Sequence, residues 1–185
     1  MKSRSVCHLG LSAFVCFFMT ASVVAADSKP VKHQITGLFS TDREQDLREA
    51  MAKIPGIKLV SIDFKNAEAT VEYDAAIAFP KAKPEQVLDQ FDTLLKAASS
   101  NTFGVKPLRT TPLEKLKLIE IPIGGLDCKA CCLAAYESIF RIEGVERATA
   151  SFRDGRVTAL IDPEKTTRAK LEAALKQKGV QITSP

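Results

Sequence analysis

The chain has 185 residues, with 26 lysines and arginines, 22 aspartates and glutamates, and a formal net charge of +4. It contains no basic run with interleaved aromatic residues, so we expect no nucleic-acid partner. It has two histidines and no Ser-His-Asp or paired-carboxylate pattern, so we expect neither an enzyme of those classes nor a catalytic residue.

The first 26 residues have the pattern of a secretory signal peptide. Lys2 and Arg4 form a basic start, an apolar run covers 9–19, and small residues lead up to Ala26. We expect cleavage after Ala26 and a periplasmic or secreted mature protein of 159 residues, with 24 basic and 22 acidic residues. No later apolar run is long enough for a transmembrane helix, so we expect no stable membrane insertion after signal removal.

The mature chain repeats itself at a constant offset of 88 positions. Residues 36–74 align with residues 124–162 without a gap. Identical pairs include Gly37/Gly125, Leu38/Leu126, Gly56/Gly144, Phe64/Phe152 and Asp74/Asp162. Identity at one fixed offset indicates a duplication.

The first copy predicts the order strand, helix, strand, strand, helix, strand. A strand over 33–39 precedes a helix that is closed by Gly56, and alternating apolar residues then predict a hairpin with its turn at 65–68. Pro84 opens the second helix, and a strand over 105–109 closes the copy. The expected inward positions are Leu47, Met51, Ile54, Val60, Ile62, Phe64, Ala69, Val71, Tyr73, Leu88, Phe91 and Leu95.

The second copy predicts the same order. A strand over 116–123 precedes a helix that is closed by Gly144, and a hairpin follows with its turn at 153–156. Thr167 is expected to cap the second helix, Gly179 to end it, and 180–183 to form the last strand. The expected inward positions are Ala135, Ile139, Ile142, Ala148, Ala150, Phe152, Val157, Ala159, Ile161, Leu171, Ala174 and Leu175.

This order predicts an α+β fold of two tandem ferredoxin-like βαββαβ sandwiches, each with two helices on a four-stranded antiparallel sheet. We expect a first domain without cysteines over 32–109, a linker over 110–115 and a second domain over 116–185. Each unit has roughly 70–80 residues, near the lower limit for independent stability, so we expect the two units to pack together.

The cysteines of the expected mature chain all lie at the start of the first helix of the second copy. They are Cys128, Cys131 and Cys132. A disulfide framework needs cysteines that are spread along the chain, which this cluster does not provide. The first copy has Ser40, Arg43 and Glu44 at the equivalent positions, so the fold that the copies share does not need the thiols.

A Cys-x-x-Cys pair at a helix N-terminus can turn both sulfur atoms toward one point. Unpaired backbone N–H groups and the positive end of the helix dipole stabilise thiolates there, and Lys129 adds a positive charge. Two thiolates suit a soft ion such as Cu(I), Hg(II), Zn(II) or its heavier relative Cd(II). Two-coordinate binding leaves the ion open to a thiolate from a partner protein, which favours transfer over storage.

The stretch 125–132, GLDCKACC, in a βαββαβ unit resembles the heavy-metal-associated (HMA) domain family, whose pattern is Gly-Met-x-Cys-x-x-Cys. That family includes copper metallochaperones, the metal-binding domains of P-type metal ATPases and the periplasmic mercury-binding protein. The match covers 116–182, with Leu126 in place of the usual Met. The resemblance implies that Cys128 and Cys131 are metal ligands, and that the partner is a metal donor or acceptor such as a transporter.

Two further residues are candidate ligands, each with a structural alternative. Cys132 lies about 100° around the helix from Cys131 and can instead be a small buried hydrophobe. Asp127 offers a hard oxygen to a divalent ion such as zinc or cadmium, but Asp is also a good helix-entry residue.

The same cysteine pair supports a second hypothesis, because thiol–disulfide exchange proteins also present Cys-x-x-Cys at a helix start. Against it, the chain has no tryptophan and lacks the Trp-Cys-Gly-Pro-Cys sequence, and its element order differs from that of thioredoxin. A third hypothesis is an interaction module whose thiols are incidental. The hypothesis that we place first is an exported protein that captures or transfers a soft metal ion without catalysing a reaction.

Overall fold

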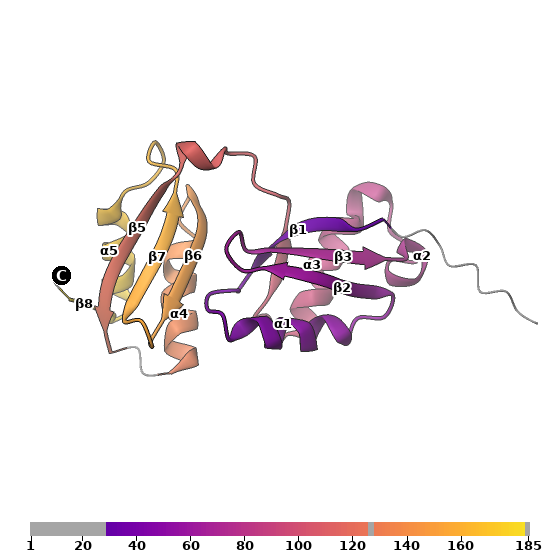
Figure 1. Cartoon of the computed structure of the whole chain (residues 1–185), viewed down its shortest axis with the longest axis horizontal. Coiled ribbons are helices and arrows are strands. Elements are labelled where there is room, and N and C mark those ends of the chain that lie inside the picture. Colours follow the sequence, from indigo (N-terminus) through magenta and orange to yellow (C-terminus); the bar gives the residue numbers. More distant parts are fainter. Residues whose placement is uncertain (1–28, 126–127, 184–185) are drawn as a thin grey trace, which may run out of the picture.

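The computed structural model of the protein describes residues 29–125 and 128–183 (Figure 1). The expected signal peptide and Asp127 lie outside these residues. Within the described part of the chain, no helix has both the length and the hydropathy that crossing a bilayer requires.

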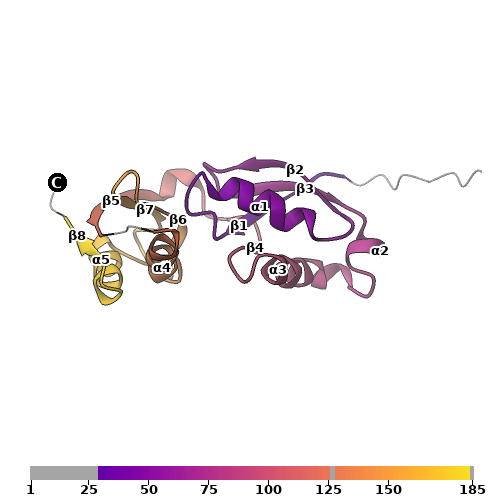
Figure 2. The same ribbon diagram turned by 90° about the horizontal axis from the view of Figure 1, so that it is seen from below.

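The first unit is one four-stranded antiparallel sheet with its helices on one face (Figure 2). Its strands are β1 (Val31–Thr36), β2 (Ile57–Asp63), β3 (Glu68–Tyr73) and β4 (Gly104–Lys106), in the order β2-β3-β1-β4. Its main helices are α1 (Arg43–Ala52) and α3 (Val87–Ala98), and the connection from β3 to α3 contains α2 (Ala75–Ala78) and the 3-10 turn η1 (Pro84–Gln86). The short helix α2 was not expected from the sequence.

The second unit has the same architecture. Its strands are β5 (Lys117–Gly124), β6 (Val145–Ser151), β7 (Arg156–Ile161) and β8 (Gln181–Ile182), in the order β6-β7-β5-β8. Its helices are α4 (Lys129–Phe140) and α5 (Arg168–Gln177), and η2 (Leu113–Lys115) lies between β4 and β5. The expected fold, two tandem ferredoxin-like βαββαβ units, is confirmed.

The duplication extends to backbone detail. Gly56 and Gly144 both have positive φ, at 76° and 87°, where each ends the turn after a helix. Each carbonyl accepts a hydrogen bond from the N–H of the equivalent aspartate, Asp74 at 3.2 Å and Asp162 at 2.7 Å. A Cβ on Gly144 would lie 2.6 Å from that of Lys165, so both the conformation and the space require glycine there.

Each unit has its own hydrophobic core between its sheet and its helices. Several expected core positions are at most 1% exposed, among them Leu47, Met51, Phe91 and Leu95 in the first unit and Ala135, Ile139, Leu171 and Leu175 in the second. Two expected inward positions are wrong, since Val60 is 45% exposed and Phe152 is 52% exposed. A register shift between Leu59 and Ser61 breaks the alternation of β2, and Phe152 lies beyond the end of β6.

The first strand also ends earlier than its sequence predicts. The expected strand over 33–39 stops at Thr36, because Gly37 has a φ of 83° and turns the chain out of the sheet. The loop over 37–42 then runs toward the second unit and packs against it, beside the hairpin that joins β2 and β3 (Figure 1). The expected packing of the two units against each other is therefore present, and it uses this loop.

Candidate metal centre

Cys128 is the N-cap residue of α4 and has an extended backbone, with φ −147° and ψ 159°. Its Sγ accepts a hydrogen bond from the backbone N–H of Cys131 at 3.2 Å. Gly125 turns the chain between β5 and α4 with a φ of 75°. The sulfur of Cys128 thus lies against the positive end of the helix dipole, where a thiolate is favoured over a thiol.

The two cysteines of the Cys-x-x-Cys pair are both within reach of solvent. Cys128 is exposed, and Cys131 is half-buried at the edge of the core of the second unit. Residues three apart at a helix start lie on one side of the helix. The structure therefore brings these two predicted ligands together at the open first turn of α4.

Cys132 has a different environment. It is 2% exposed and belongs to the core of the second unit, and its backbone N–H donates to the carbonyl of Cys128 at 3.1 Å. Burial raises the pKa of the Cys132 thiol, so this residue is a neutral thiol at physiological pH. Its additional-ligand role stays a prediction, as does that of Asp127, which lies outside the described residues.

The described residues provide two thiols at this point and no larger ligand set. Across residues 29–125 and 128–183, no three His, Cys, Asp or Glu side chains gather in a way that could hold a metal ion. A structural zinc site takes four ligands. The donor set in place instead suits a soft ion that accepts two thiolates.

The charge beside the pair is set by the first unit. Lys129 Nζ lies 3.4 Å from Asp42 Oδ2, and both side chains are about half exposed. A hydrogen bond from Ser40, reinforced by the nearby Lys129, lowers the pKa of the Asp42 carboxyl. Lys129 was identified from the sequence, whereas Asp42 was not; at the repeat offset, Asp42 corresponds to Ala130.

In the first unit, an arginine occupies the position that corresponds to one of the predicted metal ligands of the second unit. Arg43, the equivalent of Cys131, places its guanidinium 5.3 Å from the ring centre of Phe39 and 5.2 Å from that of Phe103. It also forms an ion pair with Asp46. A cation in this position is unfavourable for a bound metal ion.

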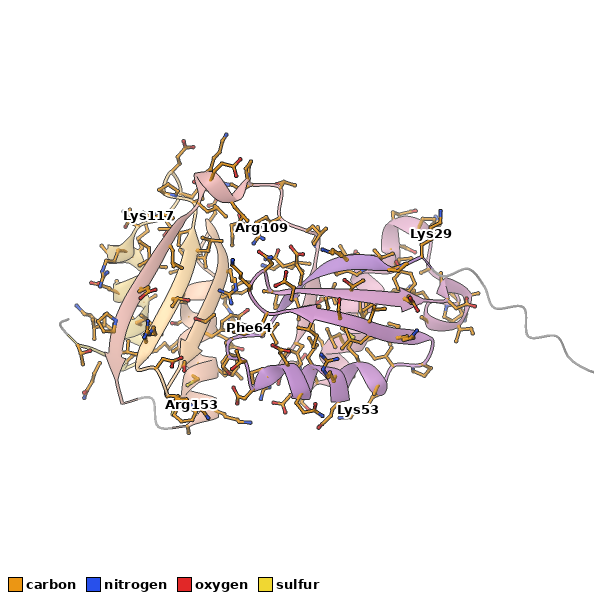
Figure 3. All side chains as sticks on the ribbon, in the orientation of Figure 1. Lys29, Lys53, Phe64, Arg109, Lys117 and Arg153 are labelled. Atoms are coloured by element: carbon orange, nitrogen blue, oxygen red, sulfur yellow. The ribbon has the colours of Figure 1, made fainter. Side chains whose placement is uncertain are left out.

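A cavity of about 290 Å³ lies between the units, next to the N-terminus of α4. The first unit contributes Phe39, Asp42 and Phe64 to its lining, and the second contributes Lys129, Cys132 and Phe152. Figure 3 shows Phe64 at the boundary between the units. Arg147 of the second unit stacks on that ring at 5.0 Å and donates from Nη2 to the Phe64 carbonyl at 2.9 Å.

Comparison with known proteins gives relatives in metal transport. No family model matches the chain. Over 165 residues it is 22% identical to the human protein "Copper-transporting ATPase 2", an alignment that covers 81% of this chain and 11% of that protein. Over 75 residues it is 28% identical to the "Zinc-transporting ATPase" of Synechocystis sp., covering 40% of this chain and 10% of that protein. The chain therefore spans about a tenth of the length of these curated relatives.

Among solved structures, the chain is similar to oxidized MerP from Ralstonia metallidurans CH34. The identity is 24%, the coverage is 37% of this chain and 94% of that one, and the TM-score is 0.35. The curated relatives, both metal-transporting ATPases, bear out the resemblance to the heavy-metal-associated domain family that the Cys128–Cys131 motif indicates.

Proposed function

We propose that the protein is an exported binding protein that captures or transfers a soft heavy-metal ion through Cys128 and Cys131. The observation that carries the proposal is the N-cap geometry, in which Cys128 Sγ accepts the N–H of Cys131 at the open first turn of α4. The similarity to copper- and zinc-transporting ATPases supports heavy-metal binding or transfer as the general role.

The ion enters from solvent and replaces the thiol protons, so binding releases protons and strengthens with pH. Because the pair lies at an exposed helix end, a thiolate from a second protein can reach a two-coordinate ion. That thiolate takes the ion over by displacing Cys128 and Cys131 in turn. The partner is accordingly a thiol-bearing metal donor or acceptor, such as a transporter.

Cu(I) and Hg(II) fit this donor set better than Zn(II) or Cd(II) do. Cu(I) and Hg(II) are satisfied by two thiolates, whereas zinc prefers four ligands in a tetrahedron. Cys128 and Cys131 supply two sulfur atoms at the open first turn of α4, which suits the two-coordinate ions. The signal-like sequence up to Ala26 supports a periplasmic or secreted location, where such an ion is met outside the cytoplasm.

The proposal is tested by titrating the reduced mature protein with Cu(I), Hg(II) and Zn(II) against competing chelators. We expect one tightly bound ion per chain and its loss in the Cys128→Ser, Cys131→Ser double variant. Cys132→Ala is the matched control, since it removes one buried thiol and leaves the pair intact. Unchanged affinity in the double variant rules out this site.

The hydrogen bond from Cys131 N–H to Cys128 also favours a second candidate function, thiol–disulfide exchange. A thiolate stabilised at a helix N-terminus is the nucleophile of such proteins. The reduction potential of the Cys128–Cys131 couple and an insulin-reduction assay separate the two functions. A strongly oxidising potential together with turnover supports the redox role, whereas tight ion binding without turnover supports the metal role.

A further inference from the structure

The loop over 37–42 of the first unit is here called the plug loop. At the repeat offset it corresponds to residues 125–130 of the second unit. At the constant offset, Phe39 corresponds to Asp127 and Ser40 to Cys128. The plug loop carries no thiol, yet it is not an idle surface loop. It packs against β6 and against α4, the helix that contains Cys132.

Besides the ion pair of Asp42 with Lys129, three contacts attach the plug loop to the second unit. The backbone N–H of Gly37 donates to the Tyr136 hydroxyl at 2.8 Å. The N–H of Ala150 donates to the Phe39 carbonyl at 2.9 Å, which pairs a backbone group of β6, the edge strand of its sheet. The rings of Phe39 and Tyr136 lie 5.7 Å apart. These bonds are directional, so they fix the loop in one position.

Phe39 is part of the core of the second unit, although it belongs to the first. It is 2% exposed and packs within the cluster that contains Cys132, Tyr136 and Ala150. Burying a whole phenylalanine side chain stabilises more than a half-exposed ion pair such as Asp42–Lys129 does. The aromatic ring is therefore the principal anchor of the plug loop.

The first unit presents this ring from a fixed conformation. A Cβ on Gly37 would lie 1.9 Å from the carbonyl oxygen of Thr102, so only glycine permits the turn that leads to Phe39. The guanidinium of Arg43 lies over the Phe39 ring, 5.3 Å from its centre. Gly37 and Arg43, the counterpart of Cys131, thus hold the anchor in place.

The plug loop lies on the side of α4 that bears Cys132. Phe39 and Cys132 line the same cavity, and Asp42 and Lys129 pair at its edge. Cys132 is nearly inaccessible, whereas Cys128 in the same turn is exposed. Neighbouring thiols at the start of one helix therefore differ in exposure, and the less exposed one shares a buried cluster with Phe39 of the first unit.

We propose that the first unit is an intramolecular cover for Cys132. The plug loop, anchored by Phe39, keeps the third thiol away from solvent, so that an arriving ion or oxidant meets Cys128 and Cys131. This second part of the inference rests on the proposed function: the cover also limits a bound ion to two sulfur ligands from this chain. A third internal thiolate would fill the coordination position that a partner's thiolate needs for transfer.

The cover is tested first without metal, in a Cys128→Ser, Cys131→Ser background, where Cys132 is the one thiol of the mature chain. The rate of its reaction with a thiol reagent at fixed pH reports its accessibility. We expect slow reaction in this background and an increase of about tenfold or more when Phe39→Ala is added, because cysteine reactivity follows exposure. Tyr136→Phe, which removes the acceptor of the Gly37 N–H, is expected to give a smaller increase.

Phe79→Ala is the matched control. Phe79 is as buried as Phe39, but it packs in the first unit's own core against Tyr73 and Phe91. It weakens the first unit without removing a side chain of the plug loop, so its effect on the Cys132 reaction rate measures the contribution of overall destabilisation, and Phe39→Ala is expected to give a larger increase than Phe79→Ala does. Circular dichroism identifies any variant that fails to fold, and Tyr136→Phe then carries the test. If Cys132 reacts at the same rate with and without the substitution of Phe39 or, where that variant does not fold, of Tyr136, the plug loop does not cover Cys132.

The consequence for the ion is measured by X-ray absorption of the Hg(II)- or Cu(I)-loaded protein with all three cysteines present. We expect two sulfur neighbours in the unaltered chain, three in Phe39→Ala, and two again in Phe39→Ala, Cys132→Ala. An unchanged sulfur number in Phe39→Ala overturns the limit on ligands. If the unaltered chain binds no ion, the proposed function fails, while the thiol kinetics still decide the cover on their own.

Discussion

At the scale of single residues, Tyr136 shows how one polar atom joins the two units. Its ring lies in the core of the second unit, stacked on Phe140 at 5.0 Å, while its hydroxyl accepts the N–H of Gly37. Burial raises the pKa of this hydroxyl well above its ordinary value, so it remains neutral and able to hydrogen-bond throughout the physiological range. The chain has two tyrosines, and this one lies at the boundary between the units.

Tyr136→Phe is expected to lower the free energy of unfolding by about 1–3 kcal/mol, because it leaves the Gly37 N–H buried without its acceptor. Urea denaturation followed by circular dichroism measures the change. Tyr73→Phe is the control, since Tyr73 contacts His33 and Phe79 within the first unit and takes no part in the boundary. Equal effects of the two substitutions contradict the role assigned to the Tyr136 hydroxyl.

Asp42 gives a residue-scale prediction for pH. The hydrogen bond from Ser40, with Lys129 nearby, lowers its pKa in the folded state. Its contribution to stability is therefore present above the unfolded pKa of about 4 and is lost as the pH falls through the lower folded value. Both partners of the ion pair are about half exposed, so Asp42→Asn is expected to cost less than about 1 kcal/mol at neutral pH.

The measurement is the midpoint of urea unfolding between neutral pH and the acid range. The difference between the unaltered chain and Asp42→Asn should shrink as Asp42 becomes protonated. A difference that grows toward acid pH would show that the carboxyl is not stabilised in its ionised form.

At the scale of elements, the start of α4 combines a structural task with a chemical one. The Sγ of Cys128 caps the helix by accepting the N–H of Cys131, so the atom that we propose as a metal ligand also satisfies a backbone donor. The second helix of the same unit begins differently, because Thr167 occupies the N-cap position of α5 without a side-chain cap bond. Thr167 therefore occupies the expected N-cap position, but its side chain does not form the hydrogen bond of a cap.

The two tasks of Cys128 are separated by two substitutions at the same position. Cys128→Ser keeps an acceptor at the N-cap, whereas Cys128→Ala removes it and is expected to destabilise the chain by about 1 kcal/mol relative to serine. Both are expected to lose tight ion binding. Thermal unfolding and a metal titration of the two variants provide the comparison, and equal stability of serine and alanine variants contradicts the capping role.

At the scale of the whole molecule, the sequence predicts the architecture well because the pattern of each helix and strand occurs in both copies of the repeat. The periodic apolar positions identify both cores, and Cys128 and Cys131 were placed correctly at a helix start. Phe39 was expected at the end of a strand, and its insertion into the other unit was not foreseen. Local periodicity shows that a residue is apolar within an element, but it does not show which unit buries a residue of a loop.

The same limit applies to the surroundings of the site. Lys129 is adjacent to Cys128 in the sequence, whereas its partner Asp42 is 87 positions away and becomes its neighbour only when the units pack. The bulge that exposes Val60 is likewise set by the pairing of β2 with β3 rather than by the residues of β2 alone. Contacts between units and register shifts are properties of the assembled fold.

Because Phe39 completes the core of the second unit, the two units are expected to unfold as one cooperative system. Phe91→Ala removes a fully buried ring from the core of the first unit alone and should cost about 3–5 kcal/mol. If the units are coupled, backbone amides of β6 and β7 in the second unit should also lose protection from hydrogen exchange. Leu171→Ala, in the core of the second unit, should lower protection in β1 and β3 in return. Loss of protection confined to the altered unit would show that the plug loop rests on the second unit without supporting it.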